Sequence, residues 1–388
     1  MHFPCTVASL TLLAVLPVSA ILRDPKCTDH EALDGQYVDG AVIMNDDPLA
    51  HFDYPMVTVF NSSVSETWAF DAASKDGKAG IVVYLSRGTV IGSLAAQRGL
   101  ISVVWPNGTR YMENTFVEES NLRMCKKTTE GTWTNSSGVV TWKFTADKDF
   151  KGAEVTIDSP EIQGTFTLRS RGPPLYPGGL VYPDASAHTL LAPQMYWQEQ
   201  FPVADAEANL TIRGTPFTLS GIGGRDKNWN SFPWAAVSPS WDMVRAISGP
   251  YGLMLWNFTS SADGLPYFSA TLMKNGKVIF RTASATASDT ETYGTVERIS
   301  TGAVHLASPP GTLSPLPESR HTGYLVNFVS PKTREHWTFT VGFTSTTFWF
   351  PASETQTVGQ YVGQVTGGLN GKKQYHGYAS GSVMELGL

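Results

Sequence analysis

Hydrophobic and polar residues alternate in short runs along most of the chain, as in half-buried β-strands. The runs are rich in β-branched and aromatic residues and recur every ten to fifteen positions. Clear examples cover residues 81–85, 139–144, 155–157, 165–168, 210–212, 253–256, 267–272 and 337–341. Helical periodicity is weak, and only residues 93–98 are a candidate for a short helix. The pattern predicts an all-β protein built of antiparallel barrels or sandwiches.

Two short segments between alternating runs have the composition of tight turns. Asn275-Gly276 separates Leu272 from the run 278–280 and is a strong signal for a type I′ hairpin. Arg213-Gly214 lies between two alternating runs, the first of which is 210–212, and indicates a second tight turn.

The amino terminus has the pattern of a targeting segment. The apolar run 10–16 is followed by Val18-Ser19-Ala20, a small-residue cleavage signature. The run is shorter than the roughly 20 apolar residues that span a bilayer, and no later stretch approaches that length. We expect residues 1–20 to be a signal peptide cleaved near Ala20, and the mature protein to be secreted without a membrane span.

The cysteines and glycosylation motifs fit passage through an oxidising compartment. Cleavage would remove Cys5 and leave Cys27 and Cys125, for which we predict a disulfide that closes a loop of 98 residues. Five N-x-S/T acceptor sites occur, at Asn61, Asn107, Asn135, Asn209 and Asn257.

Composition narrows the possible functions. The net charge of −6 gives no cationic face for nucleic acid, and 41% hydrophobic residues exclude disorder. Only 16% of residues are charged, whereas 44 are Phe, Trp or Tyr, which suggests a dry, aromatic cavity. The eight histidines form no HxH or HExxH pair, and G-x-S-x-G, GxGxxG and P-loop motifs do not occur. We therefore expect no metal and no cofactor.

The segment 221–229, Gly-Ile-Gly-Gly-Arg-Asp-Lys-Asn-Trp, concentrates polar chemistry after a glycine-rich bend. Buried charges persist when they are paired, so Asp226 could form an ion pair with Arg225 or Lys227 that pins a barrel corner. The alternative is a polar patch at the inner edge of an aromatic cavity.

These residues resemble a known family. The similarity lies in Phe201-Pro202, 210–214 and 221–229, in 66–71 and 81–84 upstream, and in 249–251 and 346–350 downstream. Together they resemble carotenoid 1,2-hydratase-like (hydroxyneurosporene-synthase-like) proteins and fungal lipocalin-type Diels–Alderases. One departure is Gly224-Arg225, where relatives often carry Tyr-His before the Asp, so an acid/base role for that His does not transfer.

The resemblance implies two lipocalin-like antiparallel β-barrel or sandwich domains packed around a shared pocket. We expect domains at 21–220 and 221–388, with a Pro/Gly-rich loop at about 171–194 in the first; a boundary near Arg171 is the alternative. The leader, sequons and cysteine pair resemble those of the secretory intermolecular hetero-Diels–Alderases of tropolone–sesquiterpenoid biosynthesis.

That subgroup implies a cofactor-free, inverse-electron-demand hetero-Diels–Alder addition. Its apolar partners would be a polyketide-derived, tropolone-type ortho-quinone methide and a humulene-type sesquiterpene, as in fungal meroterpenoid biosynthesis. The chain does not fix the oligomeric state, and a homodimer stays open. An intramolecular (decalin-forming) Diels–Alderase, a terpenoid hydratase or isomerase, and a non-catalytic carrier of an apolar metabolite are the competing hypotheses, with a purely structural wall protein a more distant one.

Candidate site residues follow from chemistry and position. Catalytic candidates are Tyr196, Asp226, Lys227 and His321; substrate-binding candidates are Trp197, Gln198, Trp241, Trp256, Phe348 and Phe350. For the aromatic residues, packing in a β core is the competing interpretation. Because side chains alternate along a strand, Phe348 and Phe350 should share a face that lines a cavity or a domain interface.

Overall fold

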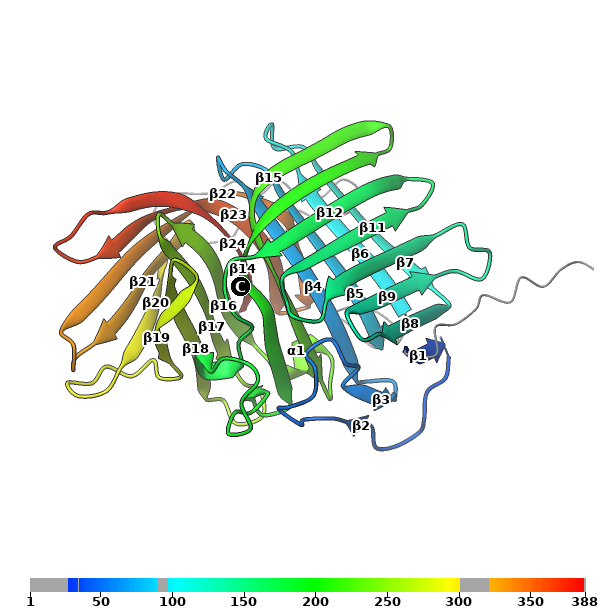
Figure 1. Cartoon of the computed structure of the whole chain (residues 1–388), viewed down its shortest axis with the longest axis horizontal. Helices are drawn as coiled ribbons and strands as arrows, with labels where there is room; N and C mark the ends of the chain where they lie inside the picture. The colour runs from blue at the N-terminus through cyan, green and yellow to red at the C-terminus, as the bar shows by residue number, and fades with distance from the viewer. Residues whose placement is uncertain (1–26, 34, 89–96, 301–320, 387–388) are drawn as a thin grey trace, which may run out of the picture.

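Two large antiparallel β-sheets lie side by side and make up almost all of the structure (Figure 1). The computed structural model describes residues 27–33, 35–88, 97–300 and 321–386. This architecture confirms the prediction of an all-β protein with two β units around a shared pocket.

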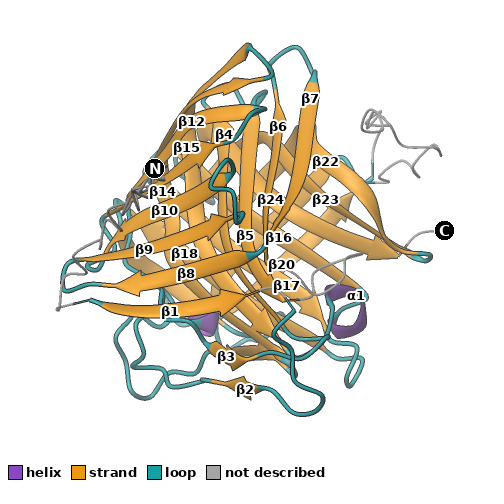
Figure 2. Cartoon of the chain, turned by 90° about the vertical axis from the view of Figure 1, so that its right-hand side faces the viewer, coloured by secondary structure: helices purple, strands orange, loops and turns teal. Residues whose placement is uncertain are grey.

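The first sheet contains thirteen strands from the amino-terminal half of the chain. In spatial order they are β1 (Thr28–Leu33), β8 (Glu119–Met124), β9 (Thr128–Thr134), β10 (Thr141–Asp147), β11 (Gly152–Asp158), β12 (Ile162–Ser170), β14 (Met195–Ile212), β15 (Thr215–Asn230), β4 (Ser65–Ser74), β5 (Gly80–Gly88), β6 (Gln97–Val104) and β7 (Arg110–Val117), with β13 (Leu190–Ala192) on β14. Figure 2 shows β1, β8, β9 and β10 following one another in this order. A separate pair, β2 (Ile43–Met44) and β3 (Val57–Val59), lies at one end of the sheet.

The second sheet contains nine strands from the carboxyl-terminal half. In spatial order they are β19 (Lys277–Thr282), β18 (Pro266–Lys274), β17 (Tyr251–Thr259), β16 (Ser240–Ser248), β24 (Tyr375–Leu386), β23 (Gln356–Leu369), β22 (Glu335–Ser353), β21 (Gly323–Ser330) and β20 (Tyr293–Ile299). The short helices within the described ranges are η1 (Pro177–Gly179) and α1 (Trp234–Val237).

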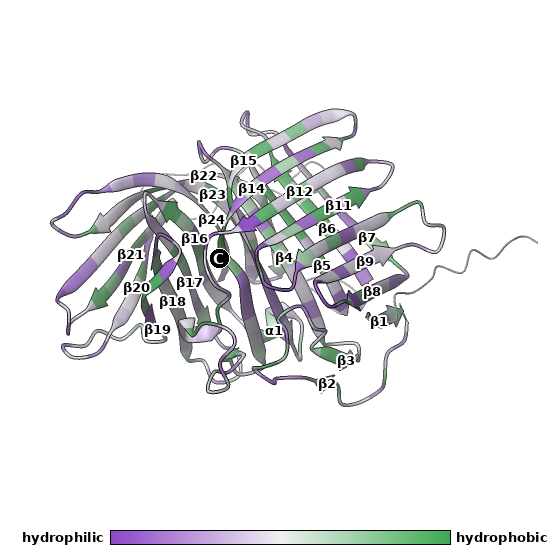
Figure 3. Ribbon diagram, in the orientation of Figure 1, coloured by the Kyte–Doolittle hydropathy of each residue, from purple (hydrophilic) through white to green (hydrophobic). Residues whose placement is uncertain are grey.

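Each sheet curls around its own hydrophobic core, and a third apolar cluster lies between them. The first core includes Trp68 and Trp133, and the second includes Leu253 and Phe339. The cluster between the sheets contains side chains from both, including Trp197 and Trp256. Hydrophobic and polar residues alternate along many strands (Figure 3), because one face of each strand packs against a core.

The sequence signals for turns are confirmed. Asn275 and Gly276 have φ of 50° and 77° between β18 and β19, and Arg213 and Gly214 have φ of 48° and 76° between β14 and β15. Positive φ at both central positions is the requirement of a type I′ turn. The expected helix at 93–98 is wrong at its end, because residues 97 and 98 begin β6; residues 93–96 lie outside the described residues.

The signature segment 221–229 forms the second half of β15, in the middle of the first sheet. It pairs with β14 on one side and β4 on the other. The expected domain boundary at residue 220 therefore falls inside a strand, and the chain crosses to the second sheet between Asn230 and Ser240.

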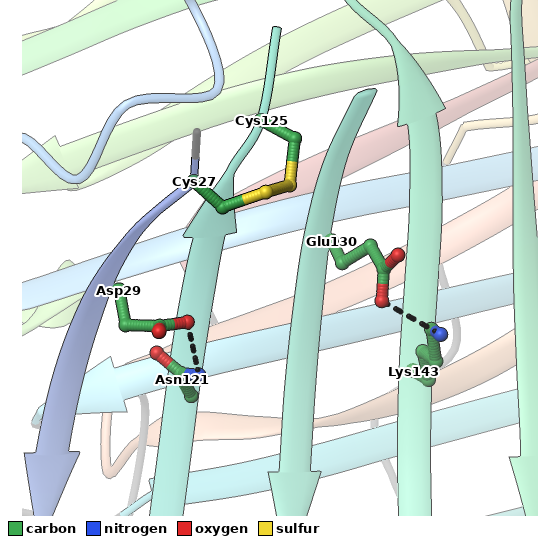
Figure 4. Close-up of a disulfide and its surroundings, with 6 residues drawn as sticks. All are labelled: Cys27, Asp29, Asn121, Cys125, Glu130 and Lys143. Atoms are coloured by element: carbon green, nitrogen blue, oxygen red, sulfur yellow. Dashed lines mark hydrogen bonds and ion pairs between the residues drawn. A yellow bond between two sulfur atoms is a disulfide. The ribbon is translucent and has the colours of Figure 1, made fainter. Parts of the chain in front are cut away.

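Cys27 and Cys125 form the predicted disulfide (Figure 4). Thr28 and Met124 are register partners in the antiparallel pair β1–β8, so the two cysteines lie opposite each other at its end. The expected signal peptide, residues 1–20, lies outside the described residues.

The acceptor asparagines differ in exposure. Asn107 and Asn209 are exposed, whereas Asn61, Asn135 and Asn257 are partly buried. The Asn61 amide donates to the Gly40 carbonyl oxygen at 2.8 Å. Glycosylation at these positions stays a prediction. Among the described residues, no helix is long and apolar enough to cross a membrane.

Candidate active site

A cavity that opens to solvent lies between the two sheets. The first sheet contributes residues from β4, β5, β6 and β15, and the second from β16, β17 and β22–β24, with one residue from α1. The wall consists of Thr67, Ala69, Asp71, Tyr84, Arg98, Leu100, Asp226, Asn228, Trp234, Trp241, Met243, Trp256, Phe348, Phe350, Val358, Gln360 and Ser382. Side chains far apart in sequence therefore meet here only because the two sheets pack against each other.

The second-sheet side of the cavity is mainly aromatic. Trp234 and Trp241 have ring centroids 5.1 Å apart, and Trp241 lies 6.5 Å from Trp256. Phe348 and Phe350 are 5.1 Å apart on the same face of β22. Rings held against one another in this way form a rigid apolar surface against which a flat or polyene ligand can stack.

Alternation along β15 decides which of its polar residues reach the cavity. Asp226 and Asn228 line it, whereas Arg225 and Lys227 point into the core of the first sheet. Asp226 thus pairs with neither of its chain neighbours, contrary to the ion pair considered from the sequence, because adjacent side chains face opposite sides of a sheet.

The buried guanidinium of Arg245, on β16, connects the two sheets. It contacts Asp71 Oδ1 at 3.1 Å, Glu199 Oε2 at 3.1 Å and Asp226 Oδ1 at 3.4 Å. It also donates to the carbonyl oxygens of Phe201 and Pro202. One cation therefore faces three carboxyl groups from the first sheet.

Burial shifts the pKa values of two of these carboxyl groups, Asp226 and Glu199, upward. Burial raises the pKa of Asp226 to about 7, with Arg245 opposing the rise and the charge of Asp71 adding to it. Burial also raises the pKa of Glu199 well above its usual value, again opposed by Arg245. Because Asp226 lines the cavity, the site has a carboxyl that can be protonated near neutral pH.

Two further contacts fix Asp226 and its cation. The indole Nε1 of Trp197 donates to Asp226 Oδ2 at 3.3 Å. Gly224 lies directly beneath the Arg245 guanidinium, and a Cβ at this position would overlap it. The glycine that departs from the expected family pattern therefore makes room for the arginine.

The structure brings five of the predicted site residues to the cavity wall: Asp226, Trp241, Trp256, Phe348 and Phe350. Trp197 lies just behind the wall, edge-on to Trp256 at 5.0 Å. The shared face expected for Phe348 and Phe350 is confirmed.

Four other predicted residues lie elsewhere. Tyr196 stacks on Trp229 at 5.3 Å, and Lys227 forms an ion pair with Glu66 at 2.7 Å, both on the opposite face of the first sheet. Gln198 is the register partner of Lys227 and is fully buried. His321 contacts Glu385 at 2.7 Å in the second sheet, and it does not line the cavity.

Sequence reasoning missed Arg245, Glu199, Asp71 and Arg98 as site residues. Asp71 is the last residue of the family-like segment 66–71, and Arg245 lies within the mainly apolar run 241–247. A charged residue in such hydrophobic surroundings is a weak sequence signal for a buried functional group. Nothing local indicates which of them meet. Within the described ranges, no three His, Cys, Asp or Glu side chains are grouped to hold a metal ion.

Comparisons with known proteins agree with this picture. The Diels-Alderase-like family matches residues 31–387. The Diels-Alderase cheD of Chaetomium globosum is 30% identical over 348 residues, which cover 89% of this chain and 80% of that relative. The Diels-Alderase ffsF of Aspergillus flavipes is 31% identical over 84% of this chain and 77% of its own length.

A solved structure shares the fold. The crystal structure of CghA with Sch210972 superposes with a TM-score of 0.74 at 23% identity, and the match covers 92% of this chain and 99% of that one. Its fold is therefore the one described above for this chain, with two curled β-sheets around one cavity.

The chain belongs to the Diels-Alderase-like family. It is a Diels–Alderase of the fungal type, acting on small-molecule substrates.

Proposed function

We propose that the enzyme catalyses an intermolecular inverse-electron-demand hetero-Diels–Alder reaction without a cofactor. The partners are a tropolone-type ortho-quinone methide and a humulene-type sesquiterpene. The cavity between the sheets holds both, and the reaction forms one carbon–carbon and one carbon–oxygen bond with no atom lost.

The observation that carries the proposal is a protonatable carboxyl, Asp226, on the wall of an otherwise mainly aromatic cavity. An all-hydrocarbon diene and alkene would gain nothing from such a group. A heterodiene does gain, because its oxygen becomes more negative in the transition state and a donor at that point lowers the barrier.

The aromatic side of the cavity supplies the rest of the catalysis. Trp241 and Trp256 present faces and edges against which two apolar partners can be held together, so that a bimolecular reaction becomes effectively unimolecular. Enclosure between the sheets also keeps out water that would otherwise add to the quinone methide.

Asp226 also suits formation of the methide by loss of water. Its carboxyl would give a proton to the departing hydroxyl, and the resulting carboxylate would recover a proton from the ring hydroxyl as the methide forms. Trp197 and Arg245, which contact the two oxygens of Asp226, hold the carboxyl in place during both transfers.

The test is to incubate a hydroxymethyl tropolone and a humulene-type alkene with the enzyme and to measure the mass and chirality of the product. A chiral adduct whose mass is that of the methide plus the alkene supports the proposal. Racemic product at the rate seen without protein contradicts it, and leaves a carrier role.

Product mass also distinguishes the other chemistries. An isomer formed from one linear polyene indicates an intramolecular cycloaddition, and gain of water by a single terpenoid indicates a hydratase. Asp226→Asn and Trp256→Ala provide the matched variants, because one removes the proton donor and the other removes part of the apolar wall.

We also propose that the enzyme passes through the secretory pathway. The Cys27–Cys125 disulfide is of the kind formed in oxidising compartments, and Asn107 and Asn209 are exposed acceptor sites. Enzymatic deglycosylation of the protein from its native host should lower its mass, and Asn107→Gln with Asn209→Gln should reduce that shift; an unchanged mass contradicts the proposal.

A further inference from the structure

Arg98 on β6 lines the cavity but takes no part in the Arg245 cluster. Its side chain is 4% exposed, and its Nε is buried without a hydrogen-bond partner. No carboxylate among the described residues forms an ion pair with it. Other buried cations of the first sheet have partners within the protein: Arg225 and Lys227 each form an ion pair with a carboxylate, and Arg87 donates to Ser120 and to the His30 carbonyl oxygen.

An unpaired buried guanidinium is costly to keep. Burial lowers the pKa of Arg98 to about 10, so the group still carries its charge at neutral pH. A buried charge is normally matched by a counter-charge, because an unmatched charge loses its hydration with nothing to replace it. Because Arg98 lines the cavity, a ligand bound there is placed to supply the counter-charge that the described residues do not.

Register places Arg98 at the end of a polar row across the cavity wall. Asn228 on β15 is opposite Thr67 on β4, Thr67 is opposite Ser86 on β5, and Ser86 is opposite Arg98. The hydroxyls of Thr67 and Ser86 are 3.0 Å apart. The next row on the same face runs Asp226, Ala69, Tyr84 and Leu100. Arg98, at the basic end of the first row, is thus on β6, and Asp226, at the acidic end of the second row, is on β15 of the same wall.

We infer that Arg98 binds an acidic oxygen pair on the substrate, so that the enzyme selects an anionic reaction partner. The planar fork of a guanidinium matches two oxygens held side by side. A tropolonate, an enolised 1,3-dicarbonyl and a carboxylate all present this chemistry. The inference rests on the proposed function in one respect: it takes the cavity to be the place where substrate binds.

This arrangement would also set the orientation of the substrate. With the acidic oxygens on Arg98, the remainder of the molecule extends along the wall toward the row that contains Asp226. Arg98 then acts as a binding and positioning group, while the proton donor is a different residue on a different strand.

The experiment measures binding by calorimetry, without turnover. Tropolone, dimedone and benzoate serve as the three acidic probes, each compared with its neutral methyl ether or ester at a pH where the acid is ionised. The enzymes are the wild type, Arg98→Met, Arg98→Lys and, as a matched control, Arg281→Met, which removes an exposed arginine on β19.

The wild type and Arg281→Met should bind at least one acid about ten- to a hundredfold more tightly than its neutral derivative. Arg98→Met should lose that preference and still bind the neutral derivative, and Arg98→Lys should keep part of it. The probe with the largest preference identifies the acidic group. Equal affinity for acid and neutral derivative in the wild type, or an unchanged preference in Arg98→Met, overturns the inference.

Two controls separate this outcome from folding and from the proposed reaction. Arg98→Met removes an unpaired buried charge, so its thermal midpoint should equal or exceed that of the wild type. An enzyme that forms the cycloadduct but shows no acid preference overturns the inference alone. An enzyme that prefers the acid but forms no cycloadduct overturns the proposed reaction alone.

Discussion

The two faces of β15 carry buried charges arranged in opposite ways. On the inner face, Arg225 pairs with Asp53 at 2.5 Å and Lys227 pairs with Glu66 at 2.7 Å, one cation to one carboxylate. Both cations also lie over aromatic rings, Arg225 over Phe144 at 4.8 Å and Lys227 over Trp68 at 4.8 Å. On the outer face, a single Arg245 serves three carboxyl groups.

This difference between the two faces distinguishes charges that stabilise the fold from charges that can take part in catalysis. Balanced pairs inside a closed core attach the segment 51–56 to the sheet: Lys227 donates to the Tyr54 carbonyl oxygen, and Glu66 accepts from the Met56 amide at 2.6 Å. The unbalanced cluster borders a cavity, where burial, assisted by the charge of Asp71, raises the pKa of Asp226 to about 7. Four consecutive polar residues of one strand therefore divide into two functions by alternation alone.

The largest effect is expected for Arg245→Met. The substitution leaves three carboxyl groups buried without their cation, so the free energy of unfolding at neutral pH should fall by about 3–5 kcal/mol. The loss should shrink at lower pH, because the carboxyl groups then become protonated. Urea unfolding measures it, with Arg281→Met as the control. Neutral-pH stability equal to that of the wild type would contradict the account of the outer cluster.

Lys227→Met breaks an inner pair and should cost about 3 kcal/mol of unfolding free energy, because Glu66 is left buried and unpaired. The kcat/KM of the folded fraction should stay at the wild-type value, since Lys227 does not reach the cavity. Adding Glu66→Gln should recover much of the stability. A large loss of kcat/KM in a stably folded Lys227→Met would contradict this account and indicate that Lys227 acts in catalysis.

Phe350→Ala tests the aromatic wall on the side of the second sheet. Phe350 is partly buried, so the cost in stability should be small, while kcat/KM should fall about tenfold as the reacting partners lose a contact surface. The matched control is Phe232→Ala, which removes a ring that is 49% exposed. Equal kcat/KM values for the two variants would contradict a reaction site at this wall of the cavity.

Much of this fold could be predicted from local sequence. Strand alternation, the turn residues at 213–214 and 275–276, and the cysteine pair each depend on a short-range rule or on simple counting. The shared face of Phe348 and Phe350 followed from the two-residue period of a strand in the same way.

The composition of the site could not be predicted as well. Which side of β15 faces the cavity depends on how the second sheet packs, and Arg245 comes from a strand of that sheet. The sequence shows Asp226 next to two cations, and proximity along the chain suggested the wrong partners. Tyr196 and Lys227 were chosen for their chemistry, and the pleat of the sheet directs them to the opposite face.

The pH dependence of kcat/KM for wild type and Asp226→Asn tests the central claim most directly. If the protonated carboxyl is the working form, the wild-type value should fall about tenfold per pH unit above a pKa of about 7. Ionisation of the substrate is common to both enzymes and cancels in their ratio. The account predicts that Asp226→Asn is slower than the wild type below pH about 7 and that the two converge above it. A ratio that does not change with pH would contradict it.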